Sequence, residues 1–131
     1  MAMTTYDARE VTIVVDGTIL TGFQDGDMVS FGKDNNFVEV QVDAQGEASA
    51  AINNDKLGTF TINLSASSPF NKKMVQLANS RKQFAVSVKH KTERASATKA
   101  FIEKTPDGAF GKATGSRTYA IKALDYKHDF T

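Results

Sequence analysis

The sequence predicts a mainly β protein, an antiparallel β-sandwich or barrel with one α-helix packed on it. Several segments alternate apolar and polar residues, which is the period of a half-buried strand. Turn signals such as Asp-Gly separate these segments, and only one stretch repeats its apolar residues at the helical period. Strands and helices do not alternate along the chain, so a parallel sheet is not expected. The length of 131 residues favours one domain spanning residues 1–131.

The first part of the chain contains the clearest strand and hairpin patterns. Residues 11–15 and 18–21 flank Asp16-Gly17, and both turn positions tolerate the positive φ of a two-residue hairpin loop. A short apolar run follows at residues 28–31. Residues 37–42 alternate cleanly, with their three valines on one side. This pattern predicts a strand with one buried and one wetter face.

The segment at residues 43–57 is small, polar and weakly periodic. It fits either a mobile hairpin loop or an arm that becomes ordered only against a neighbouring molecule. Beyond it, residues 58–64 alternate again and predict another strand. Ser68-Pro69 is a helix start signal, so the single helix is predicted over residues 69–81. Its apolar stripe consists of Phe70, Met74, Leu77 and Ala78.

The last part of the chain is less regular. Residues 84–88 predict a strand that can continue through Lys91, whereas residues 92–105 fit either a strand or a short helix. Residues 117–125 predict the last long strand, with a bulge or twist near Ala123 because its apolar residues do not keep one parity. The whole chain then contains about seven or eight strands and one helix.

Charge is unevenly distributed along the chain, although the net charge is only +1. Residues 1–71 carry three basic and ten acidic side chains, and residues 72–104 carry nine basic and two acidic ones. Folding can mix these charges over one surface, or an acidic patch can meet the basic patch of a neighbouring copy. A nucleic-acid patch in the basic segment is less favoured, because the whole chain is not basic and no interleaved exposed aromatic residues are expected in the segment.

The residues that usually carry chemistry do not form a recognisable constellation. The chain has no cysteine, and His90 and His128 are its only histidines. The sequence contains no zinc spacing, nucleophile elbow or phosphate-binding glycine motif. We therefore expect no catalytic residue, no metal site and no cofactor. The polar N-terminus resembles no signal peptide, and no stretch is apolar enough to cross a bilayer, so a soluble protein is expected.

One linked motif resembles a known family. The strand Gly-Thr-Phe-Thr-Ile-Asn-Leu at residues 58–64 leads through Ser-Ser-Pro-Phe-Asn-Lys at residues 67–72 into the helix, where Leu77 follows. This arrangement is similar to that of tail tube proteins of contractile-tailed bacteriophages, whose fold is shared with tubes of type VI secretion and of phage-tail-like bacteriocins. The resemblance covers most of the chain in order and length, but nothing in residues 92–116 contributes to it.

The resemblance implies a structural function and a set of partners. Subunits of this family form hexameric rings that stack into a hollow tube, the conduit for genome ejection, inside a contractile sheath. The implied partners are further copies of the chain and the sheath, baseplate and tail terminator proteins, with DNA passing through without specific binding. The implied location is the virion, after assembly in the host cytoplasm. A bacteriocin or type VI-like tube remains the related alternative.

The resemblance also suggests roles for the features found above. The segment at residues 43–57 would be the arm that reaches an adjacent subunit or ring, and the acidic first half would face the basic helix and strand of a neighbour. Inter-subunit contacts are therefore expected at Asn53, Asn54, Asp55, Lys56, Lys72, Lys73, Arg81 and Lys82. Glu39, on the wetter face of its strand, is a candidate for lining the channel, where a negative wall would repel phosphates.

Two other functional classes stay open at this stage. A monomeric β-barrel could bind a small ligand, with its apolar stripes lining a pocket. An undetected hydrolase is the weaker alternative, since His90 reads more readily as a surface strand residue than as a general base. Self-assembly distinguishes the first hypothesis from these two, because only a tube subunit needs to form rings.

Overall fold

The computed structural model describes residues 5–130, so residues 1–4 of the polar N-terminal stretch and residue 131 lie outside the described residues. The described part contains ten strands, one α-helix and a 3₁₀ turn at Ala8–Glu10. The strands are β1 (Thr12–Val15), β2 (Thr18–Ile19), β3 (Val29–Lys33), β4 (Val38–Val42), β5 (Ala48–Ile52), β6 (Gly58–Ser65), β7 (Phe84–His90), β8 (Glu93–Ile102), β9 (Ser116–Ala123) and β10 (Lys127–Phe130). The helix α1 is Asn71–Ser80.

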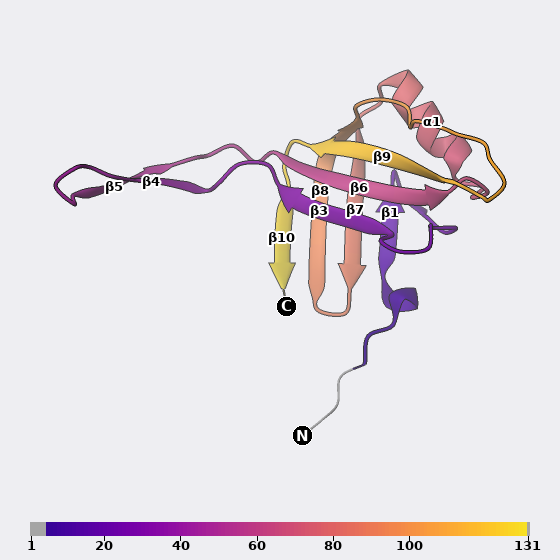
Figure 1. The fold of residues 1–131 in the computed structure, drawn as a ribbon, viewed down its shortest axis with the longest axis horizontal. Coiled ribbons are helices and arrows are strands. Elements are labelled where there is room, and N and C mark those ends of the chain that lie inside the picture. The colour runs from indigo at the N-terminus through magenta and orange to yellow at the C-terminus, as the bar shows by residue number, and fades with distance from the viewer. Residues whose placement is uncertain (1–4, 131) are drawn as a thin grey trace.

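β8 is the strand at which the main sheet divides. The sheet has eight strands in the order β2-β1-β7-β8-β9-β6-β3, with β10 paired to β8. β9 pairs with residues 100–102 of β8, whereas β10 pairs with residues 93–96 at its other end. The sheet therefore folds over at β8, and Figure 1 shows β3, β6 and β9 crossing β1, β7 and β8 at a steep angle. The predicted antiparallel β-sandwich or barrel with one helix is confirmed.

The hydrophobic core lies between these two layers. β6 alternates strictly, with Phe60, Ile62 and Leu64 completely buried and half-buried residues between them. On the neighbouring strand, Tyr119 and Ile121 of β9 lie opposite Ile62 and Phe60 and are also completely buried. Further core residues come from the other layer and the helix, namely Ile13, Val15, Phe84, Val86, Val88, Met74 and Leu77. Removing this apolar surface from water is the main force that holds the layers together.

The predicted first hairpin is confirmed. Asp16 and Gly17 connect β1 to β2 with φ of 50° and 78°, as a tight two-residue turn requires. The return strand is shorter than predicted, since β2 ends at Ile19.

α1 begins at Asn71 rather than at the predicted residue 69, because the Ser-Pro step forms a turn of its own. The Ser68 hydroxyl accepts a hydrogen bond from the Phe70 amide at 3.3 Å, and its carbonyl accepts one from the Asn71 amide at 3.4 Å. The helix ends at Ser80, where Arg81 adopts a left-handed conformation with φ of 56°. The predicted apolar stripe is confirmed, since Met74 and Leu77 are buried.

The hydrogen bonds of the Asn71 side chain explain why an asparagine lies shortly after the Ser-Pro step. Its side-chain amide donates to the carbonyl oxygens of Ser65 at 2.9 Å and Ser68 at 3.1 Å, which holds the turn between β6 and α1. Its side-chain oxygen accepts from the buried Tyr119 hydroxyl at 2.8 Å. Burial raises the pKa of Tyr119, so the hydroxyl stays protonated and can donate this bond. The motif that carries the family resemblance is therefore a structural junction.

The prediction of a buried face on residues 37–42 is wrong. β4 pairs only with β5, in a separate two-stranded sheet, and every residue of both strands is exposed. Figure 1 shows this hairpin projecting far from the rest of the molecule. The projection, which we call the arm and define as residues 36–54, starts earlier than predicted and includes a strand within the segment 43–57.

The C-terminal part also differs from the prediction. Residues 93–102 are strand β8, which resolves the ambiguity of that segment. The predicted strand at residues 117–125 ends at Ala123, and a turn leads into β10, which the sequence pattern does not reveal. Asp125 makes this turn, because its carboxylate accepts from the Lys99 amide at 2.9 Å and the Thr98 amide at 3.0 Å. Within residues 5–130 no helix has the length and apolarity needed to span a membrane.

The candidate functional site is an uncovered arm

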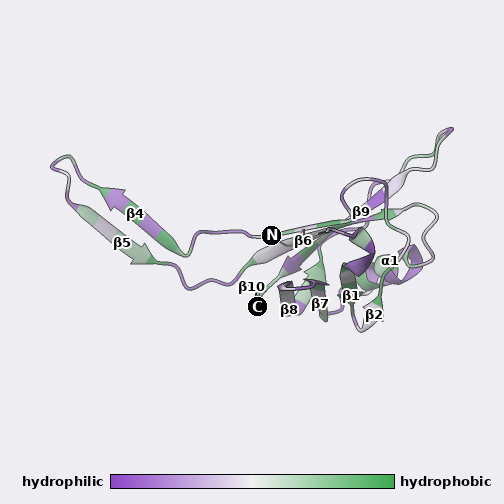
Figure 2. Ribbon diagram, turned by 90° about the horizontal axis from the view of Figure 1, so that it is seen from below, coloured by the Kyte–Doolittle hydropathy of each residue, from purple (hydrophilic) through white to green (hydrophobic). Residues whose placement is uncertain are grey.

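The arm has one apolar and one polar face. Directly opposed residues of β4 and β5 share a face, and the pairs Val38–Ile52, Val40–Ala50 and Val42–Ala48 form a face without a polar side chain. The pairs Glu39–Ala51 and Gln41–Ser49 lie on the other face. Figure 2 shows that the arm stands apart from the body in the second view as well.

The apolar face of the arm is open to solvent. Val40, Val42 and Ile52 are 66%, 64% and 69% exposed, whereas the corresponding face of β6 is completely buried. An isolated two-stranded hairpin is only marginally stable in water. Exposed apolar strips of this kind are typical of surfaces that contact other molecules.

The tip of the arm is nonetheless well defined. The Asp43 carboxylate accepts from the amides of Gln45 at 2.8 Å and Glu47 at 2.9 Å. Gly46 has a φ of 88°, which a side chain would disfavour. Side-chain hydrogen bonding to the local backbone is a typical way for an Asp to hold a turn. The hairpin is therefore shaped by its own residues.

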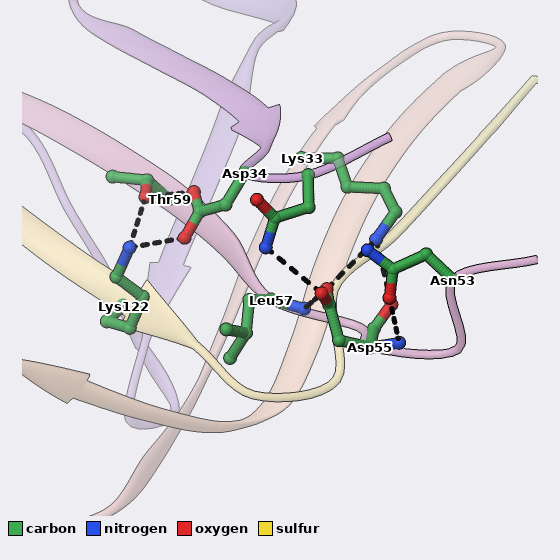
Figure 3. Close-up of polar contacts among 8 residues, drawn as sticks. Lys33, Asp34, Asn53, Asp55, Leu57, Thr59 and Lys122 are labelled. Carbon is green, nitrogen blue, oxygen red and sulfur yellow. Dashed lines mark hydrogen bonds and ion pairs between the residues drawn. The ribbon is translucent and has the colours of Figure 1, made fainter. Parts of the chain in front are cut away.

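Two carboxylates hold the root of the arm (Figure 3). Asp55, just after β5, accepts from the Asn35 amide group at 3.0 Å and forms an ion pair with Lys33 at 3.4 Å. Asp34, just after β3, accepts from the Thr59 hydroxyl at 2.7 Å and pairs with Lys122 of β9. Both legs of the arm are thus tied to the strands of the main sheet.

These contacts lower the pKa of both carboxyl groups. Hydrogen bonding from Lys122 lowers the pKa of Asp34 below its ordinary value and raises the pKa of Lys122. Desolvation raises the pKa of Asp55, but hydrogen bonds from the Leu57 amide, Asn35 and Lys33 together outweigh it, so the pKa is lowered. Both groups are therefore ionised near neutral pH and the root contacts are charged.

The residues predicted as contacts within residues 53–56 lie at the root of the arm, away from its tip. Asn53 and Asp55 act within the chain, since the Asn53 side chain accepts from the Asp55 amide at 3.1 Å. Asn54 and Lys56 are exposed beside them. Contacts of these four residues with another subunit stay a prediction.

The basic residues predicted around the helix fall into two groups. Lys73 and Lys82 both pair with the Asp16 carboxylate, at 3.6 and 3.1 Å. Hydrogen bonding from Lys82, with a smaller contribution from Lys73, lowers the pKa of Asp16. Lys72 and Arg81 are exposed. Part of the charge segregation seen in the sequence is therefore neutralised inside one subunit, as the first alternative expects.

Glu39 lies on the polar face of the arm. Its strand is not part of the main sheet, so the predicted role as a channel residue depends on where the arm goes in an assembly and stays a prediction.

Sequence reasoning missed one exposed region at the other end of the molecule. The long connection between β8 and β9 carries Phe110, which is 98% exposed. The Arg117 guanidinium lies 5.5 Å from the centre of its ring, and it donates to the Ser116 carbonyl at 2.9 Å. A lone aromatic among glycine and alanine in a polar loop is the signal that could have indicated this region.

A cavity of about 610 Å³ lies along the open edge of β3. Apolar residues including Met28 and Phe31 line it, together with His90 and Glu93. His90 lies 3.8 Å from Glu10, and His128 lies 2.6 Å from Glu93. Among residues 5–130 no three His, Cys, Asp or Glu side chains come together as a metal site would require.

Comparison with solved structures places the fold among contractile injection systems. The chain is similar to the tube-terminating cap of the anti-feeding prophage, with a TM-score of 0.70 and 12% identity over 100% of this chain and 95% of the cap chain. It is similar to a chain of the sheath–tube complex of an extracellular contractile injection system, with a TM-score of 0.67 and 11% identity over 97% and 93% of the two chains.

A third similar structure is that of a protein named Hcp1. Hcp1 from Flavobacterium johnsoniae aligns with a TM-score of 0.51 and 17% identity, over 92% of this chain and 95% of Hcp1. No protein-family model and no curated sequence matches the chain. The chain therefore has the fold of tube and tube-cap proteins, as its resemblance to tail tube proteins implies.

Proposed function

We propose that this chain is a non-catalytic, self-assembling subunit that builds the inner tube of a contractile phage tail as stacked hexameric rings. The observation that carries the proposal is the apolar face of the arm, which nothing within the described residues covers. Burying such a face against further copies is the simplest way to remove it from water. The fold shared with tube and cap proteins supports the same function.

In this role the tube lies inside a contractile sheath and joins the baseplate and the tail terminator. DNA passes through the channel without specific binding, and the subunit belongs to the virion after assembly in the host cytoplasm. The similarity to a chain of a sheath–tube complex supports the sheath as a partner. A tube of a bacteriocin or another injection system would use the same contacts.

The second candidate function is a cap that ends a tube, because the similar structures include a tube-terminating cap. A cap and a tube subunit differ in one measurable property. A tube subunit adds to its own kind without limit, whereas a cap forms one ring and stops.

Electron microscopy of the purified, concentrated protein tests both functions. We expect tubes of variable length, and single rings would favour the cap. The decisive variant replaces residues 38–52 with a short Gly-Ser turn, which is sterically possible because the Asn53 amide donates to the Phe37 carbonyl at 2.8 Å. This variant keeps the root contacts, so it should remain folded by circular dichroism but form no tubes.

A matched pair of point variants separates the apolar face from the arm as a whole. Val40→Asp places a charge on the apolar face, and Gln41→Asp places the same charge on the polar face next to it. We expect tube formation to fail for Val40→Asp and to persist for Gln41→Asp. A wild-type protein that stays monomeric at high concentration would contradict the proposal and favour a ligand-binding barrel.

A further inference from the structure

The charge of the arm restricts the surfaces on which its apolar face can dock. Residues 36–54 contain Glu39, Asp43 and Glu47 and no basic side chain. Two arms packed with their apolar faces together and their tips side by side would bring the Asp43 and Glu47 carboxylates of both arms close to each other, which is unfavourable. The cavity along the edge of β3 is also disfavoured, because Asp25, Asp27 and Glu93 line it. The receiving surface should be both apolar and basic.

A surface of that kind lies at the end of the molecule opposite the arm. A cleft of about 330 Å³ lies between residues 109–115 and residues 66–67, and we call it the far-end cleft. Phe110, Lys112 and Arg117 line it, and no acidic residue does. In Figure 1 the connection between β8 and β9 lies beside α1 at the right, whereas the arm extends to the left.

Contacts within the chain fix the shape of the far-end cleft but leave its apolar surface exposed. Arg117 lies on β9 and fixes the loop by donating to the Ala109 carbonyl at 3.5 Å, while its guanidinium stacks near the Phe110 ring. The ring stays 98% exposed, so both the aromatic surface and the neighbouring Lys112 are available. An exposed aromatic beside a cation is a good anchor for an apolar, acidic strand pair.

We propose that the apolar face of the arm docks onto the far-end cleft of a second copy of this chain. This inference depends on the proposed self-assembly and names the surface that receives the arm. The two surfaces are unlike and lie at opposite ends, so the contact is head-to-tail and can be repeated by each added copy. The acidic tip meets Lys112, and the valines of β4 cover Phe110.

A cleft at the root of the arm is the competing receiving surface, with a volume of about 470 Å³. It is apolar, and Lys56 and Lys127 line it. Its Lys33 is already paired with Asp55 within the chain, and Asp129 adds a negative charge. This cleft therefore carries less unpaired positive charge than the far-end cleft. Docking at the root of the arm is an alternative outcome of the cross-linking experiment.

Cross-linking of cysteine variants tests the docking directly, because the natural chain contains no cysteine. Ala50 and Ala51 are adjacent exposed residues on opposite faces of the arm, so Ala50→Cys and Ala51→Cys are a matched pair. Each is combined with Ala113→Cys in the far-end cleft and treated with a short bis-maleimide. We expect a ladder of covalent oligomers for Ala50→Cys/Ala113→Cys and about one-tenth of that yield for Ala51→Cys/Ala113→Cys.

Three results would overturn the docking inference alone, provided that electron microscopy still shows assembly. These are a ladder from Ala50→Cys with Lys127→Cys, a ladder from Ala50→Cys with Ala8→Cys beside the β3 cavity, and dimers from Ala50→Cys alone. Protein that forms no assembly at all contradicts the proposed function as well. The failures of the two proposals are therefore distinguishable.

A charge exchange gives an independent readout. Lys112→Glu should raise the concentration needed for assembly about tenfold, whereas Lys127→Glu in the cleft at the root of the arm should change it less than about twofold. Adding Glu47→Lys to Lys112→Glu should restore most of the lost assembly, because the attraction is re-formed with opposite signs. Equal effects of the two lysine variants, or no recovery in the double variant, would contradict the inference.

Discussion

β4 and β6 have nearly the same sequence pattern and opposite surroundings. Both alternate apolar and polar residues, yet Phe60, Ile62 and Leu64 of β6 are completely buried while Val38, Val40 and Val42 of β4 are 41%, 66% and 64% exposed. The difference shows how much an alternating strand pattern can predict. It indicates that one face requires a cover, but it does not say whether the same chain or another one provides that cover.

The largest expected difference between these strands is in the stability of the isolated subunit. Phe60→Ala should lower the free energy of unfolding by about 3–5 kcal/mol, because it removes a completely buried ring from the core. Val40→Ala should change it by less than about 0.5 kcal/mol, because its side chain is already in water. Urea unfolding of both variants at low protein concentration measures this. Similar losses would mean that the arm folds against the body in solution.

The second prediction concerns how tightly the body packs around β6. A Cβ at Gly58 would lie 2.4 Å from the ring of Tyr126, so Gly58→Ala should cost about 1–3 kcal/mol of stability. Gly32 on the neighbouring strand β3 has nothing within 4 Å of its Cβ position and is the matched control. We expect Gly32→Ala to leave the melting temperature nearly unchanged. A stable Gly58→Ala protein would show that the Tyr126 ring can move aside.

The third prediction concerns an ion pair at the junction between arm and body, where the expected loss is smaller than for Phe60→Ala or Gly58→Ala. Asp34→Asn removes the charge that pairs with Lys122, and this partly exposed pair should contribute about 0.5–1 kcal/mol. The folded-state pKa of Asp34 lies below its ordinary value of 3.8, so the contribution is present above that pH and disappears as pH falls through the folded-state pKa. Unfolding measured from pH 6 to pH 2 should therefore lose part of its acid dependence in Asp34→Asn. An identical profile would exclude a stabilising role for the pair.

Local patterns were sufficient to predict most of the body. The Asp16-Gly17 turn, the alternation of residues 58–64 and the apolar stripe of α1 each have a short-range cause, and all three are present in the structure. The Ser-Pro-Phe-Asn step was also informative, because its role depends on hydrogen bonds to nearby carbonyl groups. Such features depend little on the rest of the fold, which is why the sequence reveals them.

The arm and the end of the chain could not be predicted in the same way. The position of β4 depends on which strands pair across the sheet, and its valines fit a core strand and an interface strand equally well. The break after Ala123 depends on the Asp125 carboxylate reaching the amides of Thr98 and Lys99, far away in sequence. The root contacts of Asp34 and Asp55 are likewise long-range. The numbers of charged residues indicated that acidic and basic side chains are segregated along the chain. They could not show that Asp16 forms ion pairs with Lys73 and Lys82 in the same subunit.

The double attachment at the root also has a mechanical consequence. Asp34 fastens one leg of the hairpin to β6 and β9, and Asp55 fastens the other leg to the residues after β3. Because both legs are attached, the arm cannot rotate about one flexible backbone position. A force on its tip is therefore transmitted to the strands of the main sheet. In a row of linked copies, a force applied to one molecule would then reach the next through the hydrogen-bonded strands of the main sheet.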